Sequence, residues 1–478
     1  MATTPMRAVN PATGEAFGPG FARASRAELE AMADTAFDAV DFLADAPGAL
    51  LAGFLEDYAA RLEGDREGIA RIAHEETALP YAPRLSEVEF NRTVTQMRAA
   101  AACLRDESWR EVARDEANRL RSTLVPLGGA VVCIGPSNFP LAFNGVSGGD
   151  FCAAFAARNP VIAKAHPGHM NTTARLFAHA CAARDAAGLP AAAVQCFTDC
   201  DPADGEALLA HPGVAALAFT GSRAAGMRLK AACDALGKPA SLEMSGVNPV
   251  FVASAAAEAR AEAIAEAWAA SVLLGGGQFC TKPGVIFVSG ASAAARLAAR
   301  AAESMKAAAP AVLLTAPVRD HLAASVAALA AAGETPLCGG GAASPGHRFE
   351  PTLFSLGAAR ARELRALVTR EAFGPLGIVV AVEGDAQLVD FARGLDGQLA
   401  CTVVSDAADA AVRATLLGVL RFKAGRLLDE AMPTGVAVSP AMVHGGPMPA
   451  TGDARFTAVG LPAAARRFSK ALCLDRVR

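Results

Sequence analysis

Tryptophan, tyrosine and charged residues are scarce in this sequence. Its 478 residues include 2 Trp and 2 Tyr against 23 Phe, and only 19% of them are charged. The formal net charge is −4, so the excess of positive charge that nucleic acids or anionic membranes attract is missing, and we expect neither partner. Hydrophobic residues make up 53% of the chain, which is enough to bury a large core and excludes disorder as a description of the whole chain.

Long apolar runs and paired cysteine motifs are also missing. The longest alanine-rich stretch, residues 254–274, is interrupted by Glu258, Arg260, Glu262 and Glu266, whereas a membrane-spanning helix needs about 20 mostly apolar residues. The N-terminal residues contain no apolar core of the length that a secretory signal requires. The 11 Cys are scattered singly, without a C-x2-C or HExxH motif. We therefore expect a cytoplasmic protein with reduced thiols and no metal site.

The chain is long enough for about three domains, and its first part is expected to be helical. Within residues 25–110, apolar residues recur at steps of three or four, which is typical of a helix with one buried face. The first such stripe consists of Leu29, Ala33, Phe37, Val40 and Leu43.

From Leu124 onward the pattern changes to short apolar runs that end in turn signals, with helical stretches between them. The runs are 130–134, 160–165, 214–219 and 250–252, and the helical stretches are 172–187 and 223–236. Fully apolar strands that alternate with helices predict an α/β fold with a doubly wound parallel sheet. A second α/β series runs from about 255 to 435, with helices at 257–273, 290–308 and 318–332 and strands at 285–288, 378–382 and 400–404.

Cys280 is the first candidate for chemistry. It follows a run of three glycines and precedes a turn, and Gln278 and Lys282 give it polar neighbours. Glycines permit positive φ angles and let a ligand approach the backbone closely. A catalytic thiol also needs help to ionise, because the ordinary pKa of cysteine is about 8.5. An isolated cysteine more often packs as a small buried hydrophobe, and this alternative stays open.

Glu243 is the candidate base for that thiol. It ends a strand-like run 37 residues before Cys280, with one helix expected between them, so the two strand ends could converge. Taken alone, Glu243 would more often be a surface carboxylate, because glutamate is rarely buried.

Three further positions at strand ends are candidate ligand contacts. Asn138 lies in a proline-rich turn and offers an amide donor that suits an oxyanion, although such residues often only stabilise a turn. Lys164 ends an apolar strand, where open α/β sheets bind ligands. Ser222 opens a helix whose first N–H groups suit an anion. A solvated charge and a plain helix cap are the alternatives for the last two. No G-x-G-x-x-G motif occurs there.

Taken in order, these segments resemble the aldehyde dehydrogenase superfamily. The matching motifs are NPATGE (10–15), PSNFP (136–140), AKAHP (163–167), FTGS (219–222), LEMSG (242–246), GQFC (277–280), EAFGP (371–375) and HGGPMPAT (444–451). Within the superfamily the sequence is most similar to the 2,5-dioxopentanoate (α-ketoglutarate semialdehyde) dehydrogenase branch, and it shares much with the NADP-linked fatty aldehyde dehydrogenases. The resemblance spans essentially the whole chain.

The resemblance implies a role for each matching residue. Cys280 would attack the aldehyde and form a thiohemiacetal, whose oxyanion Asn138 and the Cys280 N–H would stabilise. Hydride transfer to the nicotinamide would leave a thioester, and Glu243 would activate the water that hydrolyses it. The implied cofactor contacts are the ribose-binding Lys164 and Glu371, Phe373 on the nicotinamide side, the pyrophosphate-binding Gly221 and Ser222, and Ser137.

The same comparison favours NADP as the cofactor, with NAD possible. NAD-preferring relatives carry an acidic residue three positions after the lysine, and here that position is Pro167, with His166 and His169 nearby. No carboxylate in this loop would repel a 2′-phosphate. The alternative is that the histidines only pack in the loop.

Two features depart from the family pattern. Asp429 and Glu430 precede PTG, where the family has an aromatic residue and an Asn near the substrate entrance, and two carboxylates there suit an anionic semialdehyde poorly unless they face solvent. Ser245 replaces a glycine two positions after Glu243. The alternative substrates are therefore neutral aliphatic or fatty aldehydes. Two alternatives of another class are a cofactor-independent thiol esterase, which would use Cys280 and Glu243, and a non-catalytic relative.

The resemblance also implies an architecture. Residues 1–117 and 137–244 would form a Rossmann-type cofactor domain, residues 245–438 an α/β catalytic domain, and residues 118–136 with 439–478 a small β arm for oligomerisation. The stretch from Arg121 to Val132 has the pattern of an exposed ribbon that needs a partner edge. We expect a homodimer or homotetramer that binds a small aldehyde.

Overall fold

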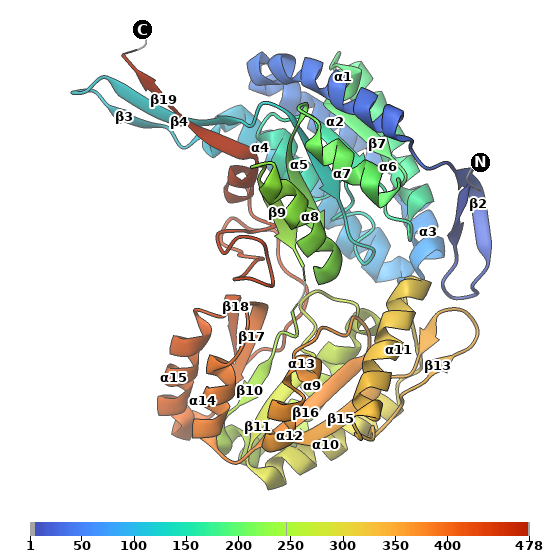
Figure 1. The fold of residues 1–478 in the computed structure, drawn as a ribbon, viewed down its shortest axis with the longest axis vertical. Coiled ribbons are helices and arrows are strands. Elements are labelled where there is room, and N and C mark those ends of the chain that lie inside the picture. The colour runs from blue at the N-terminus through green and yellow to red at the C-terminus, as the bar shows by residue number, and fades with distance from the viewer. Residues whose placement is uncertain (1–4, 245, 477–478) are drawn as a thin grey trace.

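Two α/β lobes, one above the other in Figure 1, make up most of the computed structural model, which describes residues 5–244 and 246–476. The first lobe contains a five-stranded sheet in which every pair of neighbours is parallel, as the sequence predicts. Its strands, in spatial order, are β7 (Val194–Phe197), β6 (Val161–Lys164), β5 (Ala130–Ile134), β8 (Val214–Thr220) and β9 (Ala240–Glu243).

Helices cover both faces of this sheet because its strands are apolar on both faces. On β5, Val131 and Cys133 join one core and Ala130 and Val132 the other, as alternation of side chains along a strand requires. The helices of this lobe are α1 (Arg26–Asp45), α2 (Gly48–Gly64), α3 (Arg66–Thr77), α4 (Phe90–Asp106), α5 (Gly149–Ala156), α6 (Met170–Ala186), α7 (Pro202–Ala210) and α8 (Arg223–Ala235).

The helices expected within residues 25–110 are present, but the stripe predicted for the first one contains an error. Leu29, Ala33 and Leu43 of α1 are buried. Phe37 is 57% exposed, and Ala36 and Ala39 are buried beside the other three. The buried stripe follows the 3.6-residue period of the helix, whereas the predicted stripe included the bulky Phe37, which lies off that period.

The second lobe also contains a parallel sheet, here with six strands. Their spatial order is β15 (Thr352–Gly357), β16 (Leu376–Val382), β11 (Val285–Ser289), β10 (Val250–Val252), β17 (Gln398–Val404) and β18 (Ala424–Asp429). The helices are α9 (Ser254–Leu273), α10 (Ala291–Lys306), α11 (Ala316–Ala331), α12 (Ala358–Glu363), α13 (Arg365–Val368), α14 (Asp385–Arg393) and α15 (Ala410–Leu420).

Two smaller sheets flank the lobes. One is an N-terminal hairpin, and the other is a three-stranded antiparallel sheet in the second lobe. They consist of β1 (Met6–Val9) with β2 (Ala16–Phe21), and of β12 (Ala311–Val312), β14 (Arg348–Phe349) and β13 (Ala342–Ala343).

A three-stranded antiparallel ribbon projects from the first lobe and ends near the C-terminus (Figure 1). Its strands are β19 (Ser469–Asp475), β4 (Leu120–Pro126) and β3 (Ala113–Asp115).

The expected extent of the arm, 118–136 with 439–478, needs correction. β5 lies in the middle of the first sheet, so residues 130–134 belong to that lobe. Residues 463–468 also pack into its core, through Ala464, Ala465 and Phe468. An apolar strand followed by a turn looks the same in sequence whether it is a ribbon or a core strand, which explains the wrong boundary.

In the residues that the structure describes, no helix combines the length and apolar character needed to cross a membrane.

Candidate active site

Three predicted residues converge where the two lobes meet. Asn138 follows β5 and Glu243 ends β9, both in the first lobe, whereas Cys280 lies in the loop before β11 of the second lobe. All three line one cavity of about 740 Å3. The strand ends that the sequence predicts to converge therefore do so.

A fourth residue, His444, completes this group. Its Nε2 lies 3.4 Å from the Cys280 Sγ and 3.0 Å from Glu243 Oε1. The ring is 2% exposed, and its backbone N–H donates to Thr457 Oγ1 at 3.1 Å. The ligand atoms of Cys280, Glu243 and His444 all lie within 4.8 Å of one another. Thiolate, carboxylate and imidazole also bind zinc, so the structure forms a possible metal-ligand set although the sequence predicts none.

The site holds Cys280 as a thiol and Glu243 as a carboxylate. Burial, reinforced by the charge of Glu243, raises the pKa of the Cys280 thiol well above its ordinary value. Burial also opposes ionisation of Glu243, but the charge and hydrogen bond of His444, the hydrogen bond of Cys280 and the charge of Arg467 together lower the pKa of that carboxyl. Glu243 Oε2 has no hydrogen-bond partner among the described residues. A proton acceptor therefore lies directly beside a protonated nucleophile.

Two asparagines fix the loop that carries Cys280. Asn248, fully buried, donates from Nδ2 to the Cys280 carbonyl at 2.8 Å and to the Lys282 carbonyl at 3.1 Å. Asn138 donates from Nδ2 to the Gln278 carbonyl at 2.8 Å. The predicted oxyanion donor thus lies next to the nucleophile loop, with its amide engaged by that loop.

The cavity extends from Cys280 along the C-terminal ends of the first sheet. It is lined by five of the six predicted cofactor contacts, namely Ser137, Gly221, Ser222, Glu371 and Phe373. A Cβ at Gly221 would lie 2.7 Å from the Phe219 ring, so glycine keeps this wall open. Ser222 caps α8, whose first N–H groups suit a pyrophosphate. The residues present fit a dinucleotide cofactor.

Lys164 is the exception. It is absent from the residues that line the cavity, and its Nζ lies 2.8 Å from Asp199 Oδ1. Arg23 contacts the other oxygen of Asp199 at 3.1 Å. The argument from Pro167 was therefore incomplete. Its loop contains no carboxylate, but Asp199, which follows β7, places a carboxylate beside Lys164. Asp199 lies 35 residues after Lys164 in sequence (199 − 164), so no local motif reveals it.

The two histidines of the same loop pack against each other. The rings of His166 and His169 stack with centroids 5.2 Å apart. His169 Nε2 lies 3.0 Å from the Pro136 carbonyl. Burial lowers the pKa of both rings, most strongly that of His166. Neutral rings supply no charge for a phosphate. His166 nevertheless lines the cavity, so the packing alternative is favoured for His169 alone.

Lys282 joins the nucleophile loop to the loop that carries Glu371 and Phe373. Its Nζ is buried and donates to the carbonyls of Ala372 at 2.9 Å and Leu376 at 2.8 Å. Burial lowers the pKa of Lys282 to about 8. It raises the pKa of Glu371 to about 8, against the opposing charge of Lys282.

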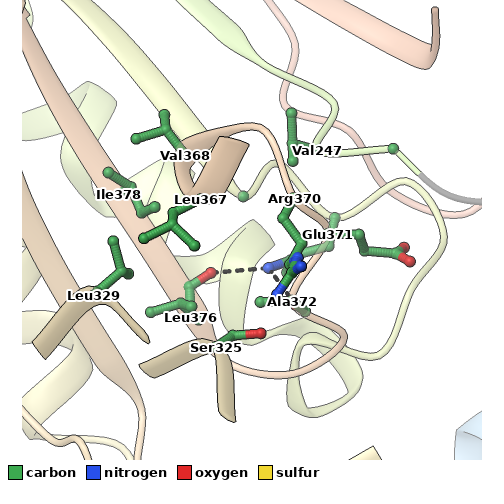
Figure 2. A pocket seen from close by; sticks show the side chains of 13 residues that line it. Val247, Ser325, Leu329, Leu367, Val368, Arg370, Glu371, Ala372, Leu376 and Ile378 are labelled. Atoms are coloured by element: carbon green, nitrogen blue, oxygen red, sulfur yellow. Dashed lines mark hydrogen bonds between the residues drawn. The ribbon is translucent and has the colours of Figure 1, made fainter. Parts of the chain in front are cut away.

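Figure 2 shows a small pocket around this connection, with the Leu376 carbonyl in its hydrogen bond. The Glu371 carboxylate points away from the apolar side chains of Leu329 and Leu367. Glu371 therefore sits between an apolar pocket and the large cavity, which it also lines.

The two acidic residues that depart from the family pattern are held by arginines. Asp429 pairs with Arg413. Glu430 lies 3.0 Å from Arg260 and accepts the Ser405 N–H at 2.5 Å. Both carboxylates are exposed and neither lines the cavity, so they face solvent. Ser245, the other departure, lies outside the described residues.

His444 and Asn248 are the site residues that sequence reasoning missed. His444 stands in the motif HGGPMPAT, which was quoted without a role for that side chain, and Asn248 lies just before β10. The signal available for His444 was its position in a glycine- and proline-rich motif shared with the family.

Comparisons with known proteins agree with this geometry. The profile described as the aldehyde dehydrogenase family matches residues 1–425. The chain is 37% identical to alpha-ketoglutaric semialdehyde dehydrogenase 2 of Azospirillum brasilense, over 98% of this chain and 90% of the relative. It is 35% identical to alpha-ketoglutaric semialdehyde dehydrogenase of Acinetobacter baylyi, over 95% of this chain and 87% of the relative.

Solved structures share the fold at lower identity. A 3,6-anhydro-L-galactose dehydrogenase in complex with NAP has a TM-score of 0.84 at 21% identity, covering 99% of this chain and 96% of that one. Lactaldehyde dehydrogenase from Escherichia coli has a TM-score of 0.84 at 21% identity, covering 99% and 95%. With a matching profile over most of its length and two relatives above 30% identity along nearly all of it, the chain belongs to the aldehyde dehydrogenase family.

Proposed function

We propose that this NAD(P)-dependent aldehyde dehydrogenase oxidises 2,5-dioxopentanoate to 2-oxoglutarate. The observation that carries the reaction is the meeting of the Cys280 thiol, the Glu243 carboxylate and the Asn138 amide at one end of the cavity. The names of the two relatives at 35–37% identity support the substrate.

The side chains divide the reaction between them. Cys280 passes its proton to the Glu243 and His444 pair, which touches it directly, and attacks the aldehyde carbon. The amide of Asn138 turns from the Gln278 carbonyl to the oxyanion, which is the former aldehyde oxygen of the adduct with Cys280. A bound nicotinamide cofactor supplies the hydride acceptor. Once the first proton has left the pair for solvent, Glu243 Oε2 accepts a proton from the water that attacks the Cys280 thioester. Cleavage of the carbon–sulfur bond then releases the carboxylic acid, and the sulfur of Cys280 takes up a proton again.

The direct test is a substrate panel with the purified enzyme. Reduced nicotinamide is followed by absorbance with 2,5-dioxopentanoate, succinic semialdehyde, and short and long aliphatic aldehydes. We expect the highest kcat/KM for 2,5-dioxopentanoate, and no turnover in Cys280→Ala. Preference for neutral aldehydes would replace the proposed substrate with the aliphatic alternative, and ester hydrolysis without any nicotinamide-dependent oxidation would identify a thiol esterase.

For the cofactor we propose NADP, with NAD also accepted. Pro167 leaves its loop without a carboxylate, and the charge of Asp199 is compensated by Lys164 and Arg23. Asp199 still bears on the choice, because it holds the lysine that would otherwise meet a 2′-phosphate. We expect Asp199→Asn to raise kcat/KM for NADP relative to NAD by about tenfold, since one like charge is removed. The matched control is Asp185→Asn, which removes an exposed carboxylate that pairs with Arg184 and touches neither Lys164 nor Arg23. An unchanged ratio in Asp199→Asn would remove Asp199 from cofactor choice.

We also propose a cytoplasmic homodimer or homotetramer, with the first lobe binding the cofactor and the second carrying the nucleophile. The 11 unpaired cysteines support a reducing compartment. The projecting ribbon supports self-association, because each of its edge strands, β19 and β3, has a neighbouring strand on one side only within the described residues.

A further inference from the structure

A buried ion pair contacts the turn that carries Asn138. Arg84 and Glu89 form this pair, and the Glu89 side chain is fully buried. Both lie in a short π-helical segment, Tyr81–Glu89, directly before α4. Hydrogen bonds in a π-helix join residues five positions apart, so the segment brings these two side chains to the same side of the chain.

Glu89 fixes the far end of the turn. Its Oε1 accepts the N–H groups of Leu141 at 2.8 Å and Ala142 at 3.0 Å. Gln96 of α4 donates from Nε2 to the Ala142 carbonyl at 3.0 Å. A shift of this backbone would leave buried polar groups without partners, which is costly. Residues 141 and 142 are therefore held against the helical segment.

Arg84 fixes the near end of the same turn. One arm of its guanidinium group, Nη1, binds Glu89, and the other, Nη2, donates to the Asn138 carbonyl at 3.0 Å. Because the group is planar and its donors point in fixed directions, the position of Glu89 sets the position of the Asn138 backbone.

The same guanidinium group also contacts the nucleophile loop. Its carbon lies 4.4 Å from the centre of the Phe139 ring and 5.7 Å from that of Phe279. The two rings meet edge to face, with centres 5.6 Å apart. Phe139 follows Asn138 and Phe279 precedes Cys280 in the sequence. Cation–π attraction therefore draws the neighbours of the amide donor and of the nucleophile toward one charge.

Fixed backbone matters at Asn138 because its amide has to exchange partners. In this structure Nδ2 donates to the Gln278 carbonyl at 2.8 Å. An oxyanion donor is effective when its position is set before the charge develops, and rotation of the side chain aims the amide correctly only if the backbone stays in place. A buried ion pair contributes little net stability compared with apolar side chains, so its contacts with the turn are the better explanation for it.

We propose that Arg84 and Glu89 are positioning residues that act through Asn138 on the oxyanion. The proposal rests on the proposed function, because it takes Cys280 as the nucleophile and the Asn138 amide as the oxyanion donor. Neither Arg84 nor Glu89 is among the described residues that line the large cavity. Loss of the pair should therefore lower kcat and leave the KM values for aldehyde and cofactor nearly unchanged.

A double-mutant cycle on kcat tests this role. Arg84→Lys keeps a charge beside Glu89 but loses the second arm that reaches the Asn138 carbonyl. We expect kcat to fall about 10- to 100-fold, somewhat less than the loss of about 10²- to 10³-fold that follows removal of an oxyanion donor. In the Asn138→Ala background the same substitution should lower kcat less than about twofold, because no amide is left to position. An equal fall in both backgrounds would overturn the proposal.

Arg66→Gln is the matched control. Arg66 also donates to a carbonyl of the π-helical segment, that of Ser86 at 2.9 Å, and its guanidinium carbon lies 4.3 Å from the centre of the Phe90 ring. These contacts lie outside the turn of residues 136–142, so we expect kcat to stay unchanged. A fall as large as that in Arg84→Lys would mean that loosening of the segment, and not the bond to Asn138, lowers kcat.

A charge-free variant covers the case in which single substitutions unfold the protein. Arg84→Met combined with Glu89→Gln leaves no unpaired buried charge, which is the main cost of breaking such a pair. We expect the same fall in kcat as in Arg84→Lys, again only where Asn138 is present. Wild-type kcat in this double variant would refute the positioning role.

The assays separate this proposal from the proposed function. The cycle uses the aldehyde of the panel that the wild type oxidises fastest, so rejection of 2,5-dioxopentanoate does not affect it. If no aldehyde is oxidised, the cycle is repeated with p-nitrophenyl acetate. Cys280 attacks the ester carbon through an oxyanion, p-nitrophenolate leaves, and water releases acetate without any nicotinamide.

Alkylation of Cys280 supplies a readout without an oxyanion. Its rate with iodoacetamide is followed by mass spectrometry in the absence of cofactor. We expect the same rate in the wild type and in Arg84→Lys. A loss of alkylation as large as the loss of kcat would show that Arg84 acts on the sulfur, which would overturn its action through Asn138.

Discussion

At the scale of single residues, the environment of Cys280 works against its own ionisation. Burial and the charge of Glu243 raise the pKa of the thiol, so near neutral pH the sulfur carries its proton. The same carboxylate is the nearest acceptor for that proton, and His444 Nε2 contacts both groups. The nucleophile is therefore held unreactive until the proton moves to its neighbours.

His444 should accordingly set the acidic limit of activity. Its charge and hydrogen bond hold the pKa of Glu243 down against burial. In His444→Gln only the Cys280 hydrogen bond and the charge of Arg467 still oppose burial, so the pKa of Glu243 rises. The carboxylate then becomes protonated, and stops acting as a base, at higher pH. We expect the acidic limb of the kcat/KM profile to move to higher pH and kcat to fall about 10- to 100-fold.

The measurement is a pH profile of the wild type and His444→Gln. His179→Gln is the control, because His179 pairs with Asp65 far from the nucleophile in sequence and outside the cavity. Superimposable acidic limbs in wild type and His444→Gln would mean that His444 does not govern Glu243.

Residues of this site could be predicted from sequence where local context marks them. Cys280 follows three glycines with φ angles of 59°, 68° and 71°, and Asn138 and Glu243 stand at strand ends. His444 lacks such a local signal. Its role depends on its contact with Cys280, 164 residues away in the sequence, which sequence patterns do not reveal.

At the scale of elements, strands with apolar runs and turn endings were predicted almost to the residue, as β5 and β10 show. The neighbours of each strand in the sheet could not be predicted, because a hydrophobic pattern identifies a strand but not the strands beside it. The arm boundary failed for this reason. The contact that Lys282 makes with the loop of Glu371 could not be predicted either, because the motif of each loop does not show which loop lies beside it.

The contact made by Lys282 predicts how two loops cooperate. Gly277 precedes the nucleophile and would clash with the Gly374 carbonyl, at 2.2 Å, if it carried a Cβ. Lys282 adds two hydrogen bonds to the same neighbouring loop. In Lys282→Met these bonds are lost and the positive charge beside Glu371 disappears, so we expect KM for the nicotinamide cofactor to rise about tenfold or more with a smaller change in kcat.

Two controls accompany this variant. Lys306→Met removes an exposed lysine of α10 and should leave KM unchanged. The alkylation rate of Cys280 without cofactor should change little in Lys282→Met. A large loss of that reactivity with no effect on KM would place Lys282 with the nucleophile loop alone.

At the scale of the whole molecule, the ribbon contributes little to the core of its own chain. β19 and β3 are its two edges, and most side chains of β19 and all of β3 are exposed. An antiparallel ribbon with open edges and exposed apolar residues is a template for pairing with another chain. This is the physical basis for expecting self-association through the arm.

Substitution of one exposed leucine on the ribbon tests that expectation. Leu472 on β19 is 41% exposed, and Leu236 at the end of α8 is 43% exposed, so the two form a matched pair. We expect Leu472→Arg to shift the mass measured by light scattering toward the 48.6 kDa of one chain, because a charge on the ribbon opposes burial against a partner. Leu236→Arg should leave the assembly intact. Retention of the full mass by Leu472→Arg, with an unchanged melting temperature, would move the interface away from this strand, whereas loss of mass in both variants would point to general destabilisation.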